Sequence, residues 1–205
     1  MVRKRRGRPA GKSGQAPILN PDEIKRVFKI AQSRTRLSAR SEAALFISIY
    51  LGLRAKEMAS LKWGDVFESD GRVRELLRLQ SAYTKGSKLR DLYLTAPKLR
   101  QALTKYGSSF EFWKKPEAPL FKSQKQGHMK PASMARFMKT LFIEAGLPNA
   151  SSHTGRRTFI TSLAERGIDL KAISVLAGHS NIRTTALYVD ASPQKLSRIL
   201  SDVAW

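Results

Sequence analysis

The C-terminal third of this 205-residue sequence contains a compact set of polar residues that could act on a phosphate group. His153 and Arg156 are three residues apart, and Tyr188 follows His179 by nine residues. The whole chain has only three histidines, so the grouping of two of them with an arginine and a tyrosine is informative. A tyrosyl oxygen near such groups is suited to attack on a phosphodiester.

Two further cations lie upstream of this set. Arg54 comes at the end of a long apolar segment, where a charge is costly unless it is paired or binds a ligand. Lys85 lies in the polar run TKGSK at residues 84–88. With these two residues the sequence offers cations and hydrogen-bonding groups around one tyrosine, and no evident metal site.

Phosphodiester cleavage concentrates negative charge on the nonbridging oxygens of a five-coordinate phosphorus, and positioned donors must neutralise it. Arginine suits this task because its planar guanidinium is permanently charged and can grip two oxygens. A histidine can accept or share the tyrosine proton, and a lysine can protonate the departing 5′ oxygen. Because the phosphotyrosine conserves the energy of the broken bond, rejoining needs neither ATP nor a metal, and we expect no cofactor.

Helical patterns dominate the elements that must position these residues. Asn20-Pro21-Asp22-Glu23 is typical of a helix start, with a cap, a proline at the first position and an acid at the third. The apolar run from Ser38 predicts a buried central helix that continues toward or just short of Arg54. Apolar residues near alternation predict a β-hairpin with an exposed basic tip. The hairpin strands are expected at residues 72–79 and 89–94, and further helices at 55–62, 97–106, 131–145, 158–166, 169–176 and 193–203. The predicted fold class is mainly α with a small antiparallel β-sheet (α+β).

The composition indicates a polyanionic partner, because lysine and arginine total 38 against 16 aspartates and glutamates, a formal charge of +22. The chain has no cysteine, which excludes disulfides, thiolate nucleophiles and cysteine zinc sites and permits a reducing compartment. The longest apolar stretch, residues 43–53, is far short of the roughly 20 residues of a membrane span. The N-terminus also lacks the apolar core of a signal peptide. We therefore expect a cytoplasmic, DNA-associated protein that does not contact a membrane.

Residues 1–19 are expected to form a basic tail that does not fold by itself, because the first sixteen residues carry six cations and no acid. Arg6-Gly7-Arg8-Pro9 is similar to an AT-hook core, in which two arginine side chains enter a narrow minor groove. A generic basic arm that is attracted to phosphates is the alternative. On either interpretation, Arg6 and Arg8 are predicted to bind DNA.

Five motifs in order give the sequence a family resemblance. They are LGLR at residues 51–54 with Glu57 after it, TKGSKLR at 84–90, His-x-x-Arg at 153–156, LAGHS at 176–180, and TTALY at 184–188. Each motif alone would also fit an ordinary structural role, so it is their joint occurrence that matters. Together they resemble the catalytic domain of the tyrosine recombinases, the phage integrase family, over residues 20–205. Only about twenty residues precede the first expected helix, so we expect no separate core-binding domain in this chain.

The resemblance implies a role for each of the six residues. By it, Arg54 and Arg156 would clamp the scissile phosphate, Lys85 would be the general acid, His153 the general base, His179 a phosphate donor and Tyr188 the nucleophile. Glu57 resembles a structural neighbour that helps to hold the active-site helix. All six catalytic positions are intact in this sequence.

Some details depart from the family pattern or leave alternatives open. The family usually has leucine before the second arginine and often histidine after it, where this chain has Gly155 and Arg157. Lys88 competes with Lys85 as the general acid by its position in the hairpin. We expect both Lys88 and Arg157 to bind DNA.

Residues 192–205 have apolar residues at helical spacing and predict an amphipathic C-terminal helix. This helix could pack on its own domain, whereas the resemblance implies docking on a neighbouring protomer. The second arrangement predicts a homotetramer assembled on double-stranded DNA, with accessory DNA-bending proteins as further possible partners.

The expected function is site-specific DNA recombination of the integrase or invertase type through a 3′-phosphotyrosyl intermediate. Two alternatives stay open: a catalytically idle DNA-binding regulator derived from an integrase, and a type IB topoisomerase-like enzyme that relaxes DNA. The intact catalytic positions argue against the first alternative. The expected helix beyond Tyr188 favours recombination over the second.

Overall fold

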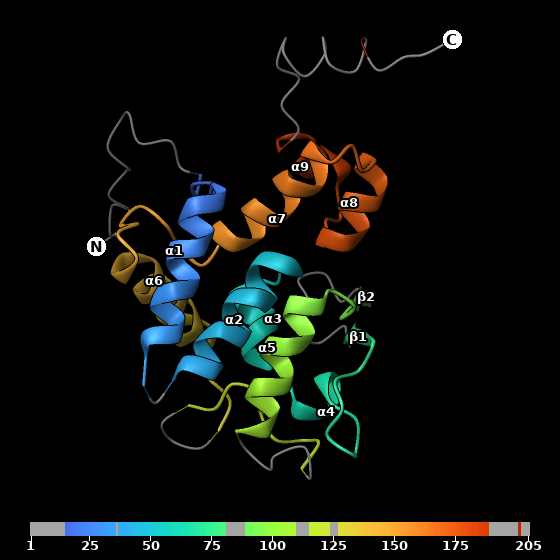
Figure 1. Cartoon of the computed structure of the whole chain (residues 1–205). Helices are drawn as coiled ribbons and strands as arrows, with labels where there is room; N and C mark the ends of the chain where they lie inside the picture. Colours follow the sequence, from blue (N-terminus) through green and yellow to red (C-terminus); the bar gives the residue numbers. More distant parts are fainter. Residues whose placement is uncertain are drawn as a thin grey trace, which may run out of the picture.

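The computed structural model describes residues 15–35, 37–80, 89–109, 115–123, 127–188 and 201. Within these ranges the protein is mainly helical with one two-stranded antiparallel sheet, which confirms the predicted fold class (Figure 1). The elements are α1 (Pro21–Ser33), α2 (Ser38–Tyr50), α3 (Ala55–Ser60), α4 (Trp63–Val66), β1 (Leu76–Leu79), β2 (Arg90–Tyr93), α5 (Pro97–Ser108), α6 (Pro131–Glu144), α7 (Thr154–Glu165), α8 (Leu170–Ala177) and α9 (Ile182–Ala186). The expected tail up to residue 14 and the expected C-terminal helix, apart from Ser201, lie outside the described residues.

Helix α2 forms the centre of the molecule. Its residues from Ser41 to Ile49 are all buried, and all of them are apolar or small except Glu42, which pairs with Lys105. Helices α1, α5 and α7 pack against it. The helix ends at Tyr50, just short of Arg54 as expected, and Gly52 then takes a φ of +63° that favours glycine.

The start of α1 has the predicted capping arrangement. Asn20 Oδ1 accepts hydrogen bonds from the backbone N–H groups of Asp22 and Glu23, and the Glu23 carboxylate accepts from the backbone N–H of Asn20. These bonds satisfy N–H groups that have no partner within the helix. None of the described helices is long and apolar enough to cross a membrane.

The predicted hairpin is present, but its strands are shorter than the apolar alternation suggested. Strand β1 pairs with β2 from Leu76 opposite Tyr93 to Leu79 opposite Arg90. Residues 72–75 instead come after the turn that follows α4, a short helix that the sequence did not predict, and Val73 forms an isolated antiparallel bridge with Phe67. The hairpin tip, with Lys85 and Lys88, lies outside the described residues.

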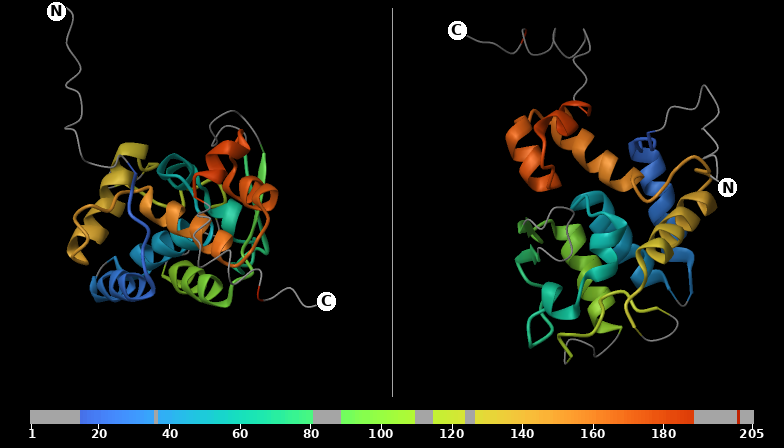
Figure 2. Two further views of the ribbon diagram at one scale, coloured as in Figure 1. Left: turned by 90° about the horizontal axis from the view of Figure 1, so that it is seen from above. Right: turned by 180° about the vertical axis from the view of Figure 1, so that it is seen from behind.

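Helices α7, α8 and α9 form a second, smaller packing unit on α2. Its buried core is made by Ile160, Ala164, Ile173 and Ala177. Helix α7 lies between α6 and α8, which are on opposite sides of the molecule (Figures 1 and 2). Helix α8 also contacts β2, and this contact brings the C-terminal motifs to the hairpin.

The predicted start of α7 at residue 158 was wrong, because the helix begins four residues earlier. Thr154 is its first residue, and the Thr154 hydroxyl accepts a hydrogen bond from the backbone N–H of Ser151 at 2.9 Å. The prediction followed the apolar residues and so missed a first turn that is polar. As a consequence Arg156 is inside the helix, where its position is fixed.

Candidate active site

Arg54 and Glu57 form the first part of the site. Arg54 immediately precedes α3, and its Nη1 donates a hydrogen bond to Glu57 Oε1 at 2.8 Å. The other carboxylate oxygen accepts from the backbone N–H of Arg54, also at 2.8 Å. The Glu57 side chain is 1% exposed, whereas that of Arg54 is 26% exposed. The buried carboxylate therefore fixes both the backbone and the side chain of Arg54.

Arg90, at the start of β2, belongs to the site although the sequence analysis gave it no role. Its Nη2 donates to Glu57 Oε2 at 2.9 Å, and its Nη1 donates to the carbonyl oxygen of Ala177. Burial lowers the pKa of this guanidinium. The strand period offered a signal, since it places Arg90 on the same inward face as Leu92. A charge on an inward face needs a partner.

Arg156 lies in the first turn of α7 and is 5% exposed. Its Nη1 donates to the carbonyl oxygen of Gly52 at 2.7 Å, and its Nη2 donates to the carbonyl oxygen of Ala177. Burial, followed by repulsion from Arg54, lowers the pKa of Arg156 to about 9. The guanidinium thus stays charged at neutral pH.

The three arginines converge on the C-terminal end of α8, where helix carbonyl groups have no partner within the helix. Arg90 and Arg156 donate to Ala177, and Arg54 Nη2 lies 3.4 Å from the carbonyl oxygen of Gly178. Gly178 has a φ of +65°, and a Cβ on it would lie 2.5 Å from Arg90 Nη1. The glycine of the LAGHS motif thus ends the helix and leaves room for a guanidinium.

The charge of this arginine cluster (Arg54, Arg90 and Arg156) is only partly balanced. In the described part of the chain, ion pairs join Arg54 and Arg90 to Glu57 and to no other carboxylate. One negative charge thus faces three guanidiniums, which leaves a net positive site. Such a site suits a phosphate, because permanently charged planar donors bind its oxygens well.

His179 directly follows the α8 terminus that the arginines hold. Its Nδ1 lies 2.8 Å from the hydroxyl oxygen of Thr185, which is fully buried. Burial, and then the nearby Arg156, Arg54 and Arg90, lower the pKa of His179 to about 4. The imidazole is therefore neutral at physiological pH and can donate only through one nitrogen.

Tyr188 lies two residues beyond α9 and packs against the small core of α7 and α8. Its ring is nearly parallel to that of His179, with 6.2 Å between centroids and an interplanar angle of 18°. The guanidinium carbon of Arg157 lies 5.8 Å from the centroid of the Tyr188 ring. Tyr188 also has a small electrostatic effect that raises the pKa of Arg156. The expected nucleophile is thus beside the arginine cluster.

The comparison with protein families decides the assignment, because residues 17–195 match the model described as the phage integrase family. The chain belongs to the phage integrase family. Curated members of this family that resemble the chain are named tyrosine recombinases. The XerD protein of Rickettsia bellii (strain RML369-C) is 31% identical over an alignment of 192 residues, and the match covers 89% of this chain and 62% of that protein. The XerD protein of Oceanobacillus iheyensis is 32% identical over an alignment of 184 residues, and the match covers 87% of this chain and 59% of that protein.

Solved structures of recombinases share the fold. The XerA recombinase is 24% identical with a TM-score of 0.69, over 96% of this chain and 68% of that one. The XerH site-specific recombinase, solved as a pre-cleavage complex with its difH substrate, is 23% identical with a TM-score of 0.70. That match covers 92% of this chain and 55% of the XerH chain. The chain spans about 60% of the length of the first two curated relatives.

A pocket of about 640 Å³ opens beside the arginine cluster of this integrase-family domain. Its lining includes Arg54, Glu57, Arg90 and His179. The rest of the lining comes from Arg78 on β1, from β2 and the residue before it, from the C-terminal half of α8, and from Gly178 and Ser180. Arg156 and Tyr188 are close by but are not part of the lining.

The departure from the family pattern at Gly155 has a steric reason. A Cβ on Gly155 would lie 2.2 Å from the hydroxyl oxygen of Ser48 on α2. The glycine thus lets α7 pack closely on the central helix. This close contact is compatible with a helical first turn that carries Arg156.

The structure brings together only part of the predicted site. His153 is exposed at the N-cap of α7, and no hydrogen bond within the described ranges joins its ring to the other site residues. Lys85, Lys88, Arg6 and Arg8 lie outside the described residues, so their roles stay predictions. No group of three or more His, Asp or Glu side chains in the described part could hold a metal ion.

Proposed function

We propose that this protein is a site-specific DNA recombinase that cleaves and rejoins DNA through a 3′-phosphotyrosyl intermediate. The observation that carries the proposal is the arginine cluster with its single carboxylate, next to a neutral histidine and a tyrosine. Family membership and the names of the similar tyrosine recombinases support the same activity.

In the proposed reaction, the Tyr188 oxygen bonds to the phosphorus of the scissile phosphate and the bond from phosphorus to the 5′ oxygen breaks. The phenol proton passes to a base, for which we propose His153. The departing 5′ oxygen takes a proton from a general acid, for which we propose Lys85 or Lys88. The reverse reaction, with a 5′ hydroxyl of another strand, restores the phosphodiester and releases Tyr188.

The arginines and His179 stabilise charge rather than move protons in this proposal. Arg54 and Arg156 bind the nonbridging oxygens as negative charge develops on them. His179 is neutral and donates a hydrogen bond from Nε2 to the phosphate. Because the cluster is bonded to Gly52, Glu57 and the end of α8, its donors are oriented before the phosphate arrives.

The finer proposals concern assembly and DNA contact. We propose that the basic tail binds DNA through Arg6 and Arg8, that residues 192–205 dock on a neighbouring protomer, and that four protomers assemble on two duplexes. DNA-bending accessory proteins are a further proposed partner. The XerH complex with difH supports double-stranded DNA as the substrate class.

The test is covalent trapping on nicked DNA. Labelled nicked duplexes that tile the DNA flanking the gene are incubated with the wild-type protein and with Tyr188→Phe, then separated under denaturing conditions. The proposal predicts a protein–DNA adduct that is lost in Tyr188→Phe. Tight binding without an adduct on any duplex would instead support an idle DNA-binding regulator. An adduct with relaxation of supercoiled DNA but no strand exchange would support a topoisomerase.

A further inference from the structure

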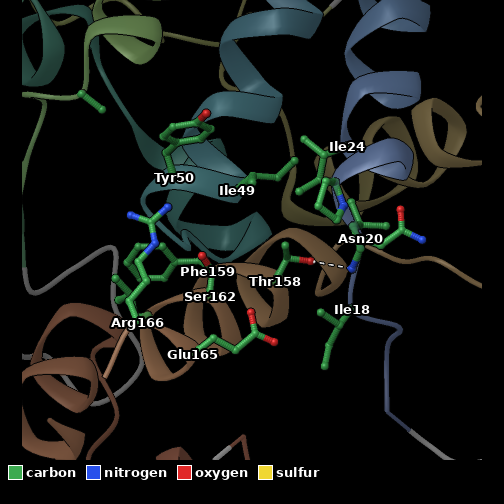
Figure 3. Close-up of a pocket in the computed structure, with 14 residues that line it drawn as sticks. Ile18, Asn20, Ile24, Ile49, Tyr50, Thr158, Phe159, Ser162, Glu165 and Arg166 are labelled. Atoms are coloured by element: carbon green, nitrogen blue, oxygen red, sulfur yellow. Dashed lines mark hydrogen bonds between the residues drawn. The ribbon is translucent and has the colours of Figure 1, made fainter. Parts of the chain in front are cut away.

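Residues 15–19, which we call the N-terminal strap, cross α7 before α1 begins. The backbone N–H of Leu19 donates to the hydroxyl oxygen of Thr158 at 3.0 Å, the dashed line in Figure 3. The Leu19 side chain is 5% exposed. Ile18 and Leu19 form one wall of a pocket of about 600 Å³, and α2 and α7 form other walls. The strap is therefore a packed part of the domain.

Arg157 joins the strap to the expected nucleophile. Its Nη1 donates to the carbonyl oxygen of Ala16 at 2.5 Å. Its guanidinium carbon also lies 5.8 Å from the centroid of the Tyr188 ring. A guanidinium can make both contacts at once, because it donates within its plane and presents its face or edge to a ring. The residue that departs from the family pattern thus has two partners within the protein.

Among the described residues, Tyr188 has few contacts besides its packing on the small core of α7 and α8. Its backbone N–H donates to the carbonyl oxygen of Thr185 at 3.0 Å, and its ring stacks with His179. The preceding helix α9 has only five residues, and the side chain of Leu187 is 71% exposed. With so few contacts on the segment, loss of the Arg157 contact is expected to move the ring or loosen it.

We propose that Arg157 is a positioning residue for Tyr188, and that the N-terminal strap holds Arg157 in place through Ala16. This proposal rests on the proposed function, in which Tyr188 is the nucleophile. Arg157 acts on the reaction through the tyrosine, without touching the phosphate. The role differs from the DNA contact that the sequence suggested for Arg157.

The first test needs no DNA and measures amide hydrogen exchange of residues 182–188 in full-length protein. We expect exchange about 3- to 30-fold faster in Arg157→Gln than in the wild type, the range that corresponds to loss of one cation–π contact. Arg157→Lys keeps a cation near the ring, so its exchange rate should lie between those of the wild type and Arg157→Gln. The matched control is Arg166→Gln, because Arg166 is an exposed arginine at the end of the same helix. Its exchange rate should equal that of the wild type.

The second test measures the rate of covalent adduct formation at saturating nicked DNA. We expect Arg157→Gln to lower this rate about 3- to 30-fold, with DNA affinity and thermal midpoint close to those of the wild type. Pro17→Gly loosens the strap next to Ala16 and should lower the rate by less. It should have no further effect in the Arg157→Gln background, because the same connection is already broken.

The outcomes separate this proposal from the proposed function. Unchanged exchange of residues 182–188 in Arg157→Gln overturns the positioning role whatever the activity. A loss of DNA affinity that accounts for the whole loss of rate also overturns it, in favour of a DNA contact. Absence of an adduct with the wild type contradicts the proposed function, and the exchange measurement still decides whether Arg157 holds Tyr188.

Discussion

The arginine cluster and the proposed nucleophile, Tyr188, are held in different ways. Arg90 and Arg156 are each 5% exposed and bonded to buried carbonyl or carboxylate groups. Tyr188 is partly exposed and is held by ring contacts at the edge of the small α7–α8 core. The positive charge that we propose receives a phosphate is thus built into the fold, whereas the proposed nucleophile is held by ring contacts and by packing on that small core. The effects of substitutions in these two regions should therefore appear in different measurements.

The largest effect is expected from Glu57→Gln, because it leaves the cluster without its buried carboxylate. Loss of one partner of a buried ion pair costs about 3–5 kcal/mol of unfolding free energy. Urea unfolding followed by circular dichroism measures this loss. Glu117→Gln is the control, since Glu117 pairs with Lys62 but is 82% exposed, and it should cost no more than about 1 kcal/mol. Equal losses in the two variants would contradict the central place of Glu57.

Gly178→Ala should have the next largest effect. Gly178 and Gly167 both have positive φ, so alanine at either position carries a backbone cost of about 1–2 kcal/mol. Only at Gly178 does the new Cβ also meet the guanidinium of Arg90, since nothing lies within 4 Å of a Cβ at Gly167. The Gly178→Ala protein should thus be less stable in urea than the Gly167→Ala protein. It should also bind DNA more weakly. Matching behaviour of the two variants would show that Arg90 moves aside at no cost.

Thr185→Val tests the nucleophile side of the comparison. We expect the hydroxyl to donate to His179 Nδ1 and so leave the proton on Nε2, which we propose donates to the phosphate. Its loss should slow adduct formation about tenfold, equivalent to about 1.4 kcal/mol. Thr185→Ser keeps the hydroxyl and should keep most of the rate, and Thr184→Val, at an exposed position, is the control. A serine variant as slow as the valine variant would refute this role of the hydroxyl.

The smallest effect is expected in the pH dependence of stability, because His179 is only half-buried and solvent screens its charge. The folded protein holds the pKa of His179 at about 4, below its ordinary value of 6.5. The unfolded chain therefore takes up the proton first, and stability falls as pH drops from about 6.5 to about 4. Above about 6.5 this contribution is constant. His179→Gln should make the urea midpoint less dependent on pH in that window, and an unchanged dependence would argue against a half-buried neutral imidazole.

Much of this architecture could be predicted from the sequence, for identifiable reasons. Capping residues and apolar periodicity are local signals, so the start of α1 and the buried helix α2 were predicted correctly. The polar first turn of α7 was missed because its residues are chosen by tertiary contacts, such as the close approach of Gly155 to Ser48. A periodicity argument cannot show such contacts.

The candidate site also contains residues that local sequence motifs identify and a residue that only long-range contacts identify. The motifs singled out Arg54, Arg156, His179 and Tyr188, which lie together in the structure. Arg90 was passed over, because its role depends on Glu57 and on the end of α8, both distant in sequence. Long-range hydrogen bonds of this kind become visible only once the chain is folded.

The central claim, that Tyr188 is the group that becomes bonded to DNA, is tested most directly by peptide mapping of the adduct. The adduct is trapped on nicked DNA, digested with nuclease and trypsin, and analysed by mass spectrometry. Cleavage after Arg183 and Lys195 gives the peptide TTALYVDASPQK, residues 184–195. Of the five tyrosines in the chain, this peptide contains only Tyr188. The account predicts a nucleotide mass on Tyr188 in this peptide. A nucleotide on any other residue would contradict it.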